Sequence, residues 1–482
     1  MLSATELSKE VANLKREADQ KDQRIKLLEE MLRLQRHKQY GASSEKDTGG
    51  QGQLFNEAED ESLDVDDDTA DITVPAHTRK KKKRVSIPAE LPREEIVHDL
   101  SDAEKVCPHD GTELKYIGDE TSEQLDIEPA KIKVLRHLRK KYACPCCEKH
   151  LITAKKPAQP IEKSIASPGL LAYVTVSKYC DALPLYRQIN IFKRIGVELD
   201  RTTLANWMIK MGSLVQPLIN RLQDVCEEQA VLHMDETPLQ VLNEPGKTAQ
   251  SQSYMWVMAT THASVPVVLY HYSASRSGDT PKALLENFSG ALMVDGYEGY
   301  NPVCQQNQLT RLGCWAHARR KFVEAQRQQP KGKTGKADVA LGLIQKLYGI
   351  EKLSKEKSTA DRHKIRQRQS KEIIEKLRRW LEKALQNTPP KTTLGKAVQY
   401  LNNQWPRLSA YVDDGDWPID NNRAENSIRP FVIGRKNWLF SASQAGAHAS
   451  ANLYSLIETA KANNLEPYAY LKEIFTLLPQ AQ

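Results

Sequence analysis

The chain has 482 residues, with 69 Lys and Arg against 62 Asp and Glu, and a formal net charge of +7. This length allows two to four domains and at least one large core. The positive charge permits a polyanionic partner and is unevenly spread, because residues 57–68 are acidic whereas residues 79–84 are all Arg or Lys. No apolar run of about 18 residues and no signal-peptide pattern occurs, so the sequence predicts a cytoplasmic protein without a membrane span.

Residues 1–40 show the heptad pattern of a short coiled coil. Its apolar positions alternate in spacings of four and three: Leu7, Val11, Leu14, Ala18, Ile25, Leu28 and Leu32, with Lys21 as the one break. The pattern predicts a homodimer or higher oligomer, and the alternative is a single amphipathic helix packed on its own chain. Residues 41–90 have no sustained apolar pattern, which predicts a disordered linker that contains the basic run.

Residues 91–155 are typical of a zinc-ribbon-like finger, with a strand expected at residues 131–135. The spacing Cys144-x-x-Cys147 suits one metal knuckle, whereas the first knuckle offers Cys107 with His109 or Asp110 beside it. A Zn²⁺ site is predicted, and the alternative is a ribbon that its apolar core holds without metal. Many Lys and Arg between residues 131 and 141 suit contacts with DNA phosphates.

Residues 156–225 form a helical region, in which residues 185–196 and 201–212 are two helices separated by a short turn. This arrangement indicates a helix-turn-helix, with Asp200 capping the second helix and Trp207 facing the core. DNA contacts are then expected from the start of the second helix: Arg201, Thr202, Thr203 and Asn206. A plain helical hairpin explains the pattern equally well.

Three acids within residues 226–445 indicate a catalytic domain. Asp235 and Asp295 each end an apolar run, at residues 231–235 and 291–295, and Glu425 lies in a short helix that Asp420 or an Asn would cap. Between the two Asp residues the pattern is a hairpin, a helix near residues 281–287 and a further strand. That order is typical of a ribonuclease-H-like α/β core, in which carboxylates hold Mg²⁺ or Mn²⁺ for a two-metal reaction on a phosphodiester. The alternative for each acid is a purely structural role, as a turn former or a helix cap.

A basic helical insertion at about residues 323–415 separates the second acid from the third, and residues 446–482 form a C-terminal helical element. Cys314 and His317 have the spacing of half a zinc site without partner ligands, so packing beneath the active site is the favoured interpretation. After Glu425, the cations Arg429, Arg435 and Lys436 are expected to hold DNA. Arg429 lies four residues beyond Glu425, and the alternative is a surface ion pair between the two.

These blocks together resemble the transposases of the insertion-sequence-66 family over nearly the whole chain. The most specific is Asp420-Asn-Asn-Arg-Ala-Glu425-Asn-Ser-Ile-Arg-Pro430. The resemblance implies a ribonuclease-H-like core with Asp235, Asp295 and Glu425 as the Asp-Asp-Glu triad, Mg²⁺ as its cofactor and accessory transposition proteins as partners. This chain departs from the family where Asp110 replaces the second finger Cys, and its C-terminal element is expected to be truncated.

The sequence thus predicts a multidomain α+β protein of the bacterial nucleoid. Its expected activity is to bind the terminal inverted repeats of a mobile element, free their 3′-OH ends and join them to double-stranded target DNA. One alternative is an inactive or truncated copy that binds element ends as a repressor. The other is a structure-directed nuclease of the same fold.

Overall fold

A computed structural model describes Lys21 and residues 24–25, 132–143, 151–261, 265–329 and 334–481. The chain divides into two compact units, one made of residues 1–66 and 154–482 and the other of residues 67–153. The predicted linker and the finger residues Cys107, His109, Asp110, Cys144 and Cys147 lie outside the described residues, as does nearly all of the predicted coiled coil.

Within the smaller unit, the described residues form an antiparallel strand pair. Strand β1 (Lys141–Ala143) pairs with β2 (Leu151–Thr153), so that Tyr142 is opposite Ile152. The strand expected at residues 131–135 is wrong, because residues 132–140 have no regular structure. Apolar side chains there find no partner surface: Val134 is 90% exposed and Leu138 is 82% exposed.

The core of the larger unit contains a six-stranded sheet with the order β5-β4-β3-β6-β7, and β8 pairs with β3. Pairing is antiparallel between β3 and β4 and between β4 and β5, and parallel for the other pairs. The strands are β3 (Val231–Asn243), β4 (Gln252–Thr260), β5 (Val268–Ser273), β6 (Ala291–Val294), β7 (Thr310–Gly313) and β8 (Ser441–Ser443). The expected hairpin, helix and strand after Asp235 are therefore present in the expected order.

One strand is longer than expected. Asp235 does not end β3, which continues for eight residues to Asn243. Beyond the acid the side chains alternate, since Leu239 and Val241 are buried while Pro238 and Gln240 are exposed, and pairing with β4 continues to Gln240. Such alternation is the signature of a strand with one buried face, so Asp235 lies inside a strand and not at its end.

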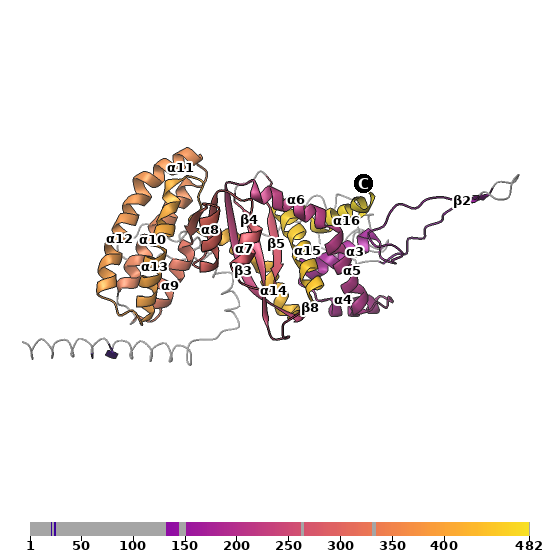
Figure 1. Ribbon diagram of the computed structural model, residues 1–482, viewed down its shortest axis with the longest axis horizontal. Helices are drawn as coiled ribbons and strands as arrows, with labels where there is room; N and C mark the ends of the chain where they lie inside the picture. Colours follow the sequence, from indigo (N-terminus) through magenta and orange to yellow (C-terminus); the bar gives the residue numbers. More distant parts are fainter. Residues whose placement is uncertain are drawn as a thin grey trace, which may run out of the picture. The chain divides into compact units, whose positions relative to one another are not determined.

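Helices lie on both faces of the sheet (Figure 1). Helix α14 (Asn422–Trp438) packs on β3 and β4, and α15 (Gln444–Ala462) packs on β5. The third acid therefore lies on a helix of 17 residues rather than on a short one. The other face carries the connections between strands, α7 (Asp279–Leu284) and α8 (Asn301–Gln306).

The predicted helical region shares one hydrophobic core with this sheet. Its helices are α3 (Pro168–Tyr179), α4 (Leu185–Arg194), α5 (Arg201–Leu214) and α6 (Gln216–Glu227), and the C-terminal helix α16 (Pro467–Leu477) packs on α3. Trp207 is buried as predicted, and Asp200 precedes α5 but its side chain makes no capping hydrogen bond. Because α5 packs on α15, the two-helix unit is built into the fold rather than attached to it.

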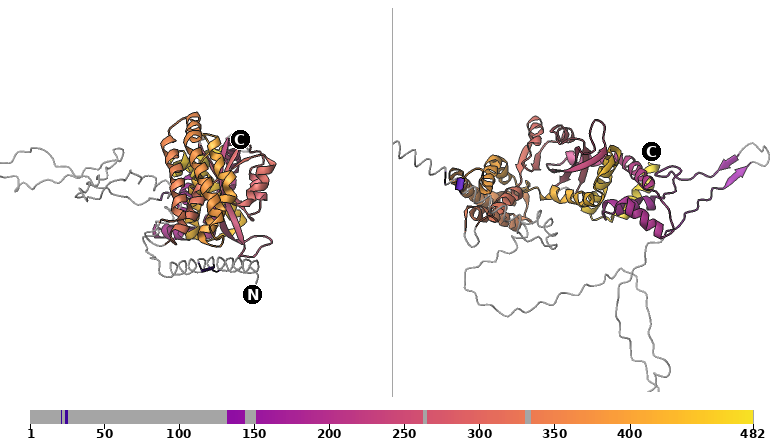
Figure 2. Two further views of the ribbon diagram at one scale, coloured as in Figure 1. Left: turned by 90° about the vertical axis from the view of Figure 1, so that its left-hand side faces the viewer. Right: turned by 90° about the horizontal axis from the view of Figure 1, so that it is seen from below.

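The insertion is a helical bundle with a core of its own, seen on the left in Figure 1 and facing the viewer in the left panel of Figure 2. Its helices are α9 (Trp315–Gln326), α10 (Lys336–Ser354), α11 (Thr359–Ile365), α12 (Lys371–Gln386) and α13 (Thr393–Ser409). Helix α9 begins at Trp315, directly after Cys314, so the bundle starts nearer to the sheet than the expected boundary at residue 323. No helix in the described part of the chain is long and apolar enough to cross a membrane.

Candidate active site

Strand pairing brings the first two acids together. Strands β3 and β6 run parallel, and His233 is opposite Met293. Continuing this register by two residues places Asp235 beside Asp295, the residue that follows β6. Neighbouring strands lie about 4.8 Å apart, so the continued register brings the two acids to adjacent positions in the chain's two strands.

The third acid approaches the Asp235 face of the sheet from α14. On β3, Thr237 lies on the same face as Asp235, and its hydroxyl accepts a 3.0 Å hydrogen bond from Arg435 of α14. Burial raises the pKa of Asp235 well above its ordinary value, and the negative charges of Glu236, Glu425 and Asp295 raise it further. Three elements far apart in the sequence thus concentrate acidic charge around one half-buried carboxyl.

Asp235 and Asp295 are each fixed by local contacts. The backbone N–H of Glu236 donates to Oδ1 of Asp235 at 2.9 Å, and the N–H of Tyr297 donates to Oδ1 of Asp295 at 2.8 Å. Arg311 of β7 donates through Nη2 to the carbonyls of Asp295 and Tyr297, at 3.0 and 2.6 Å. Arg311 therefore holds the turn that carries the second acid, a role that no local pattern in the sequence indicated.

Glu236 is a further acid that the sequence reasoning did not single out. Only 2% of its side chain is exposed; Arg276 contacts Oε1 at 2.6 Å and the Tyr300 hydroxyl donates to Oε2 at 2.7 Å. Burial raises its pKa although Tyr300 and Arg276 counteract the effect. Since successive strand residues point to opposite faces, Glu236 supports β3 from behind Asp235.

Asn421 connects the first acid to the third, and it too was missed. It is fully buried, its Nδ2 donates to the carbonyl of Met234 at 2.8 Å, and its Oδ1 lies 3.0 Å from Nδ1 of His233. Its own carbonyl accepts the N–H of Glu425 at 3.1 Å. One side chain thereby fixes the start of α14 against the residues that precede Asp235. The repeated Asn in the block Asp420-Asn-Asn was the available signal.

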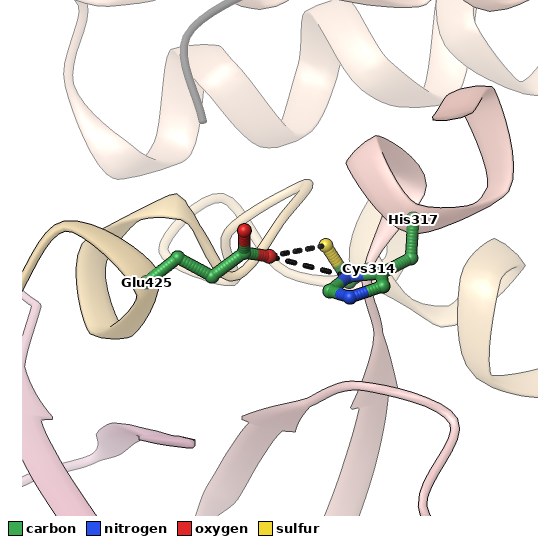
Figure 3. Close-up of side chains that lie close together, drawn as sticks. All are labelled: Cys314, His317 and Glu425. Carbon is green, nitrogen blue, oxygen red and sulfur yellow. Dashed lines mark hydrogen bonds and ion pairs between the residues drawn. The ribbon is translucent and has the colours of Figure 1, made fainter. Parts of the chain in front are cut away.

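Glu425 itself is surrounded by groups from the insertion (Figure 3). Only 2% of its side chain is exposed; Oε1 lies 3.2 Å from Nδ1 of His317, and Oε2 lies 3.3 Å from Nη2 of Arg320. The thiol of Cys314 donates to Oε1 at 3.9 Å. Burial alone would raise the pKa of Glu425, but the contacts and positive charges of His317 and Arg320 lower it.

Cys314 and His317 therefore both contact Glu425 directly. Among the described residues, their ligand atoms and that of Glu425 form one group within 4.8 Å of one another, a group that does not include Asp235 or Asp295. The third member of this group, Glu425, lies over 100 residues further along the chain than the other two.

The predicted DNA-contacting cations have different environments. Arg435 is half-buried against Thr237, whereas Lys436 is exposed. Arg429 is half-buried, and it does not form the ion pair with Glu425 that was the alternative to a DNA contact, since the cationic partners of Glu425 are His317 and Arg320. At the start of α5, Arg201, Thr202 and Asn206 are exposed and Thr203 is half-buried.

Family comparisons match these regions in order. Residues 163–449 match the model described as "Transposase IS66 family", residues 104–148 match "zinc-finger binding domain of transposase IS66", residues 27–96 match "Transposase C of IS166 homeodomain", and residues 455–482 match "IS66 C-terminal element". The described site residues fall within the first match.

Two relatives from Sinorhizobium fredii (strain NBRC 101917 / NGR234) are similar over most of the chain. "Uncharacterized protein y4qI" is 32% identical over 488 residues, which cover 98% of this chain and 89% of that protein. "Uncharacterized protein y4jD" is 33% identical over 401 residues, which cover 80% of this chain and 77% of that protein. No solved structure matches. The match across residues 163–449 shows that the chain belongs to the IS66 family of transposases.

Proposed function

We propose that the chain is a DNA transposase whose active site consists of Asp235, Asp295 and Glu425. It binds the terminal inverted repeats of its element, frees 3′-OH ends and joins them to target DNA. The observation that supports the proposal is the β3–β6 register, which leads to Asp235 and Asp295 when it is continued two residues past the pair His233–Met293. The pKa of Asp235 adds support, because burial and the charges of Glu236, Glu425 and Asp295 all raise it.

The sheet supports a ribonuclease-H-like core. Three antiparallel strands are followed by two parallel ones, and the acids lie on the first strand of this sheet, after its fourth strand and on a later helix. In this arrangement β3 carries Asp235, the turn directly after β6 carries Asp295 and α14 carries Glu425.

The donor set fits Mg²⁺ or Mn²⁺. Both are hard cations that prefer carboxylate oxygens, and Asp235, Asp295 and Glu425 would hold them. When bound, such ions polarise the phosphoryl oxygens and stabilise the attacking and leaving oxygens. The raised pKa of Asp235 supports this assignment, because the burial and neighbouring acids that disfavour its negative charge would be compensated by a cation.

Other parts of the chain supply candidate DNA contacts. The start of α5 offers Arg201, Thr202 and Asn206 to solvent, and residues 132–142 form an exposed segment with five cations: Lys133, Arg136, Arg139, Lys140 and Lys141. Such cations bind phosphate regardless of sequence, whereas side chains at a helix start can read base edges. A Zn²⁺ ion in the finger, pairing of two protomers through residues 1–40 and accessory proteins complete the proposal.

A cleavage assay on labelled DNA that carries the element's ends tests it. We expect Mg²⁺-dependent nicking by the wild-type chain and none by Asp295→Asn, while both bind the DNA equally in a mobility-shift assay. The matched control is Asp224→Asn, which makes the same change at an exposed residue of α6. Nicking by Asp295→Asn at the wild-type rate would refute the active site. Binding without nicking by the wild-type chain would favour a repressor instead.

A further inference from the structure

The Cys314, His317 and Glu425 cluster has a chemistry that the proposed reaction does not use. A hard cation takes oxygen ligands, whereas a thiol and an imidazole prefer softer cations such as Zn²⁺. Cys314 precedes α9, His317 lies in its first turn and Glu425 lies in the first turn of α14. Two helix starts therefore direct three ligand atoms of different type at one point (Figure 3).

The spacing of the ligand atoms matches a tetrahedral site. With metal–ligand lengths of about 2.3 Å for sulfur and about 2.0–2.1 Å for nitrogen and oxygen, tetrahedral ligands lie about 3.4–3.6 Å from one another. Here the sulfur of Cys314 is 3.9 Å from Oε1 of Glu425, and Nδ1 of His317 is 3.2 Å from the same oxygen. Both distances differ from these tetrahedral values by only a few tenths of an ångström, and all three ligand atoms lie within 4.8 Å of one another.

The surroundings support ligand roles for all three side chains. The backbone N–H of Asn421 donates to the sulfur of Cys314 at 3.2 Å, which stabilises a thiolate. Arg320 holds Oε2 of Glu425 and leaves Oε1 facing the cluster. Nδ1 of His317 is buried and lies 3.2 Å from Oε1 of Glu425, so it already faces the carboxylate.

We propose that Cys314, His317 and Glu425 bind a thiophilic divalent cation of the Zn²⁺ class, and that this ion competes with Mg²⁺ for Glu425. Three protein ligands leave a fourth position open to water. Binding of the ion displaces two protons to solvent, one from the Cys314 thiol and one from Nδ1 of His317. The binding claim is independent of the proposed transposase reaction, whereas the competition rests on it.

Co²⁺ reports the site directly, because thiolate ligation gives it intense near-ultraviolet absorption. We expect the full-length wild-type chain to bind one Co²⁺ more than Cys314→Ser, with the finger ions present in both. Loss of one ligand should weaken affinity by more than the roughly 10–100-fold that follows loss of an outer-shell partner. The matched control is Cys304→Ser, another buried cysteine, which should keep the wild-type stoichiometry. His317→Gln gives a second test at a half-buried position if Cys314→Ser does not fold.

Equal Co²⁺ stoichiometry in wild type, Cys314→Ser and His317→Gln would overturn the site. In the cleavage assay, the quantity compared is the ratio of rates with and without added Zn²⁺ at fixed Mg²⁺. This ratio should be at least about tenfold lower for wild type than for Cys314→Ser. If no variant cleaves DNA, the proposed function fails while the Co²⁺ measurement still decides the metal site.

Discussion

Replacing Asn421 with Ala should lower both the stability of the protein and its DNA cleavage, and the two losses can be measured separately. The variant loses the hydrogen bond to the Met234 carbonyl and the contact with His233, both in fully buried surroundings. A polar group left buried without a partner costs about 1–3 kcal/mol, so loss of the bond to the Met234 carbonyl should lower the free energy of unfolding by about 1–3 kcal/mol. Equilibrium unfolding in guanidinium measures this loss.

The same substitution should reduce DNA cleavage more than its stability loss explains, because Asn421 fixes both the β3 segment before Asp235 and the start of the helix that carries Glu425. The control is Asn452→Ala on α15, whose Nδ2 bonds Gly212 and Gln216 at 2.8 and 2.9 Å, away from the acids. Cleavage is compared under conditions where both variants remain folded. Equal losses of cleavage would refute the positioning role of Asn421.

Two further substitutions test the charges around β3. Asp235→Asn should stabilise the metal-free protein at neutral pH. The pKa of Asp235 is higher in the folded protein than in the unfolded chain, where it is about 3.9. Ionisation of Asp235 therefore lowers the stability of the wild-type protein as the pH rises above that unfolded-state pKa. Unfolding in EDTA at acidic and neutral pH measures this, and identical pH dependence in wild type and variant would contradict it. Arg276→Met should cost about 1–3 kcal/mol, below the 3–5 kcal/mol of a wholly buried pair, because Arg276 is 43% exposed while Glu236 is 2% exposed. Arg221→Met, at a surface pair, should change stability by less than about 1 kcal/mol.

Local sequence patterns predicted those helices and strands whose formation depends on residues close together in the sequence. Helices at residues 185–194 and 201–214, the hairpin after Asp235 and the strand that ends before Asp295 all follow from apolar periodicity over short windows. The predicted end of β3 was wrong because the apolar run was taken to end at Asp235. The alternation of buried and exposed residues continues through Val241.

The contacts that build the site could not be read from such windows. Asn421 bonds Met234 across 187 residues, and Arg320 meets Glu425 across 105. The sequence around each residue does not identify its partner, so periodicity and spacing could not predict these two contacts. Cys314 and His317 show the same limit, since their spacing is that of half a zinc site but only the fold brings Glu425 within 4.8 Å of them.

The insertion is attached beside the acids at both of its ends. Where the bundle begins, the N–H of Trp315 donates to the Ile419 carbonyl at 3.2 Å, and Cys314 accepts the N–H of Asn421. Where it ends, Asn421 leads directly into the helix of Glu425. Packed elements transmit displacement because protein interiors are close-packed. Any shift of the bundle on binding DNA would therefore reach Glu425 through residues 314–320 and 419–421, and would alter its position relative to both Asp235 and the Cys314–His317 pair.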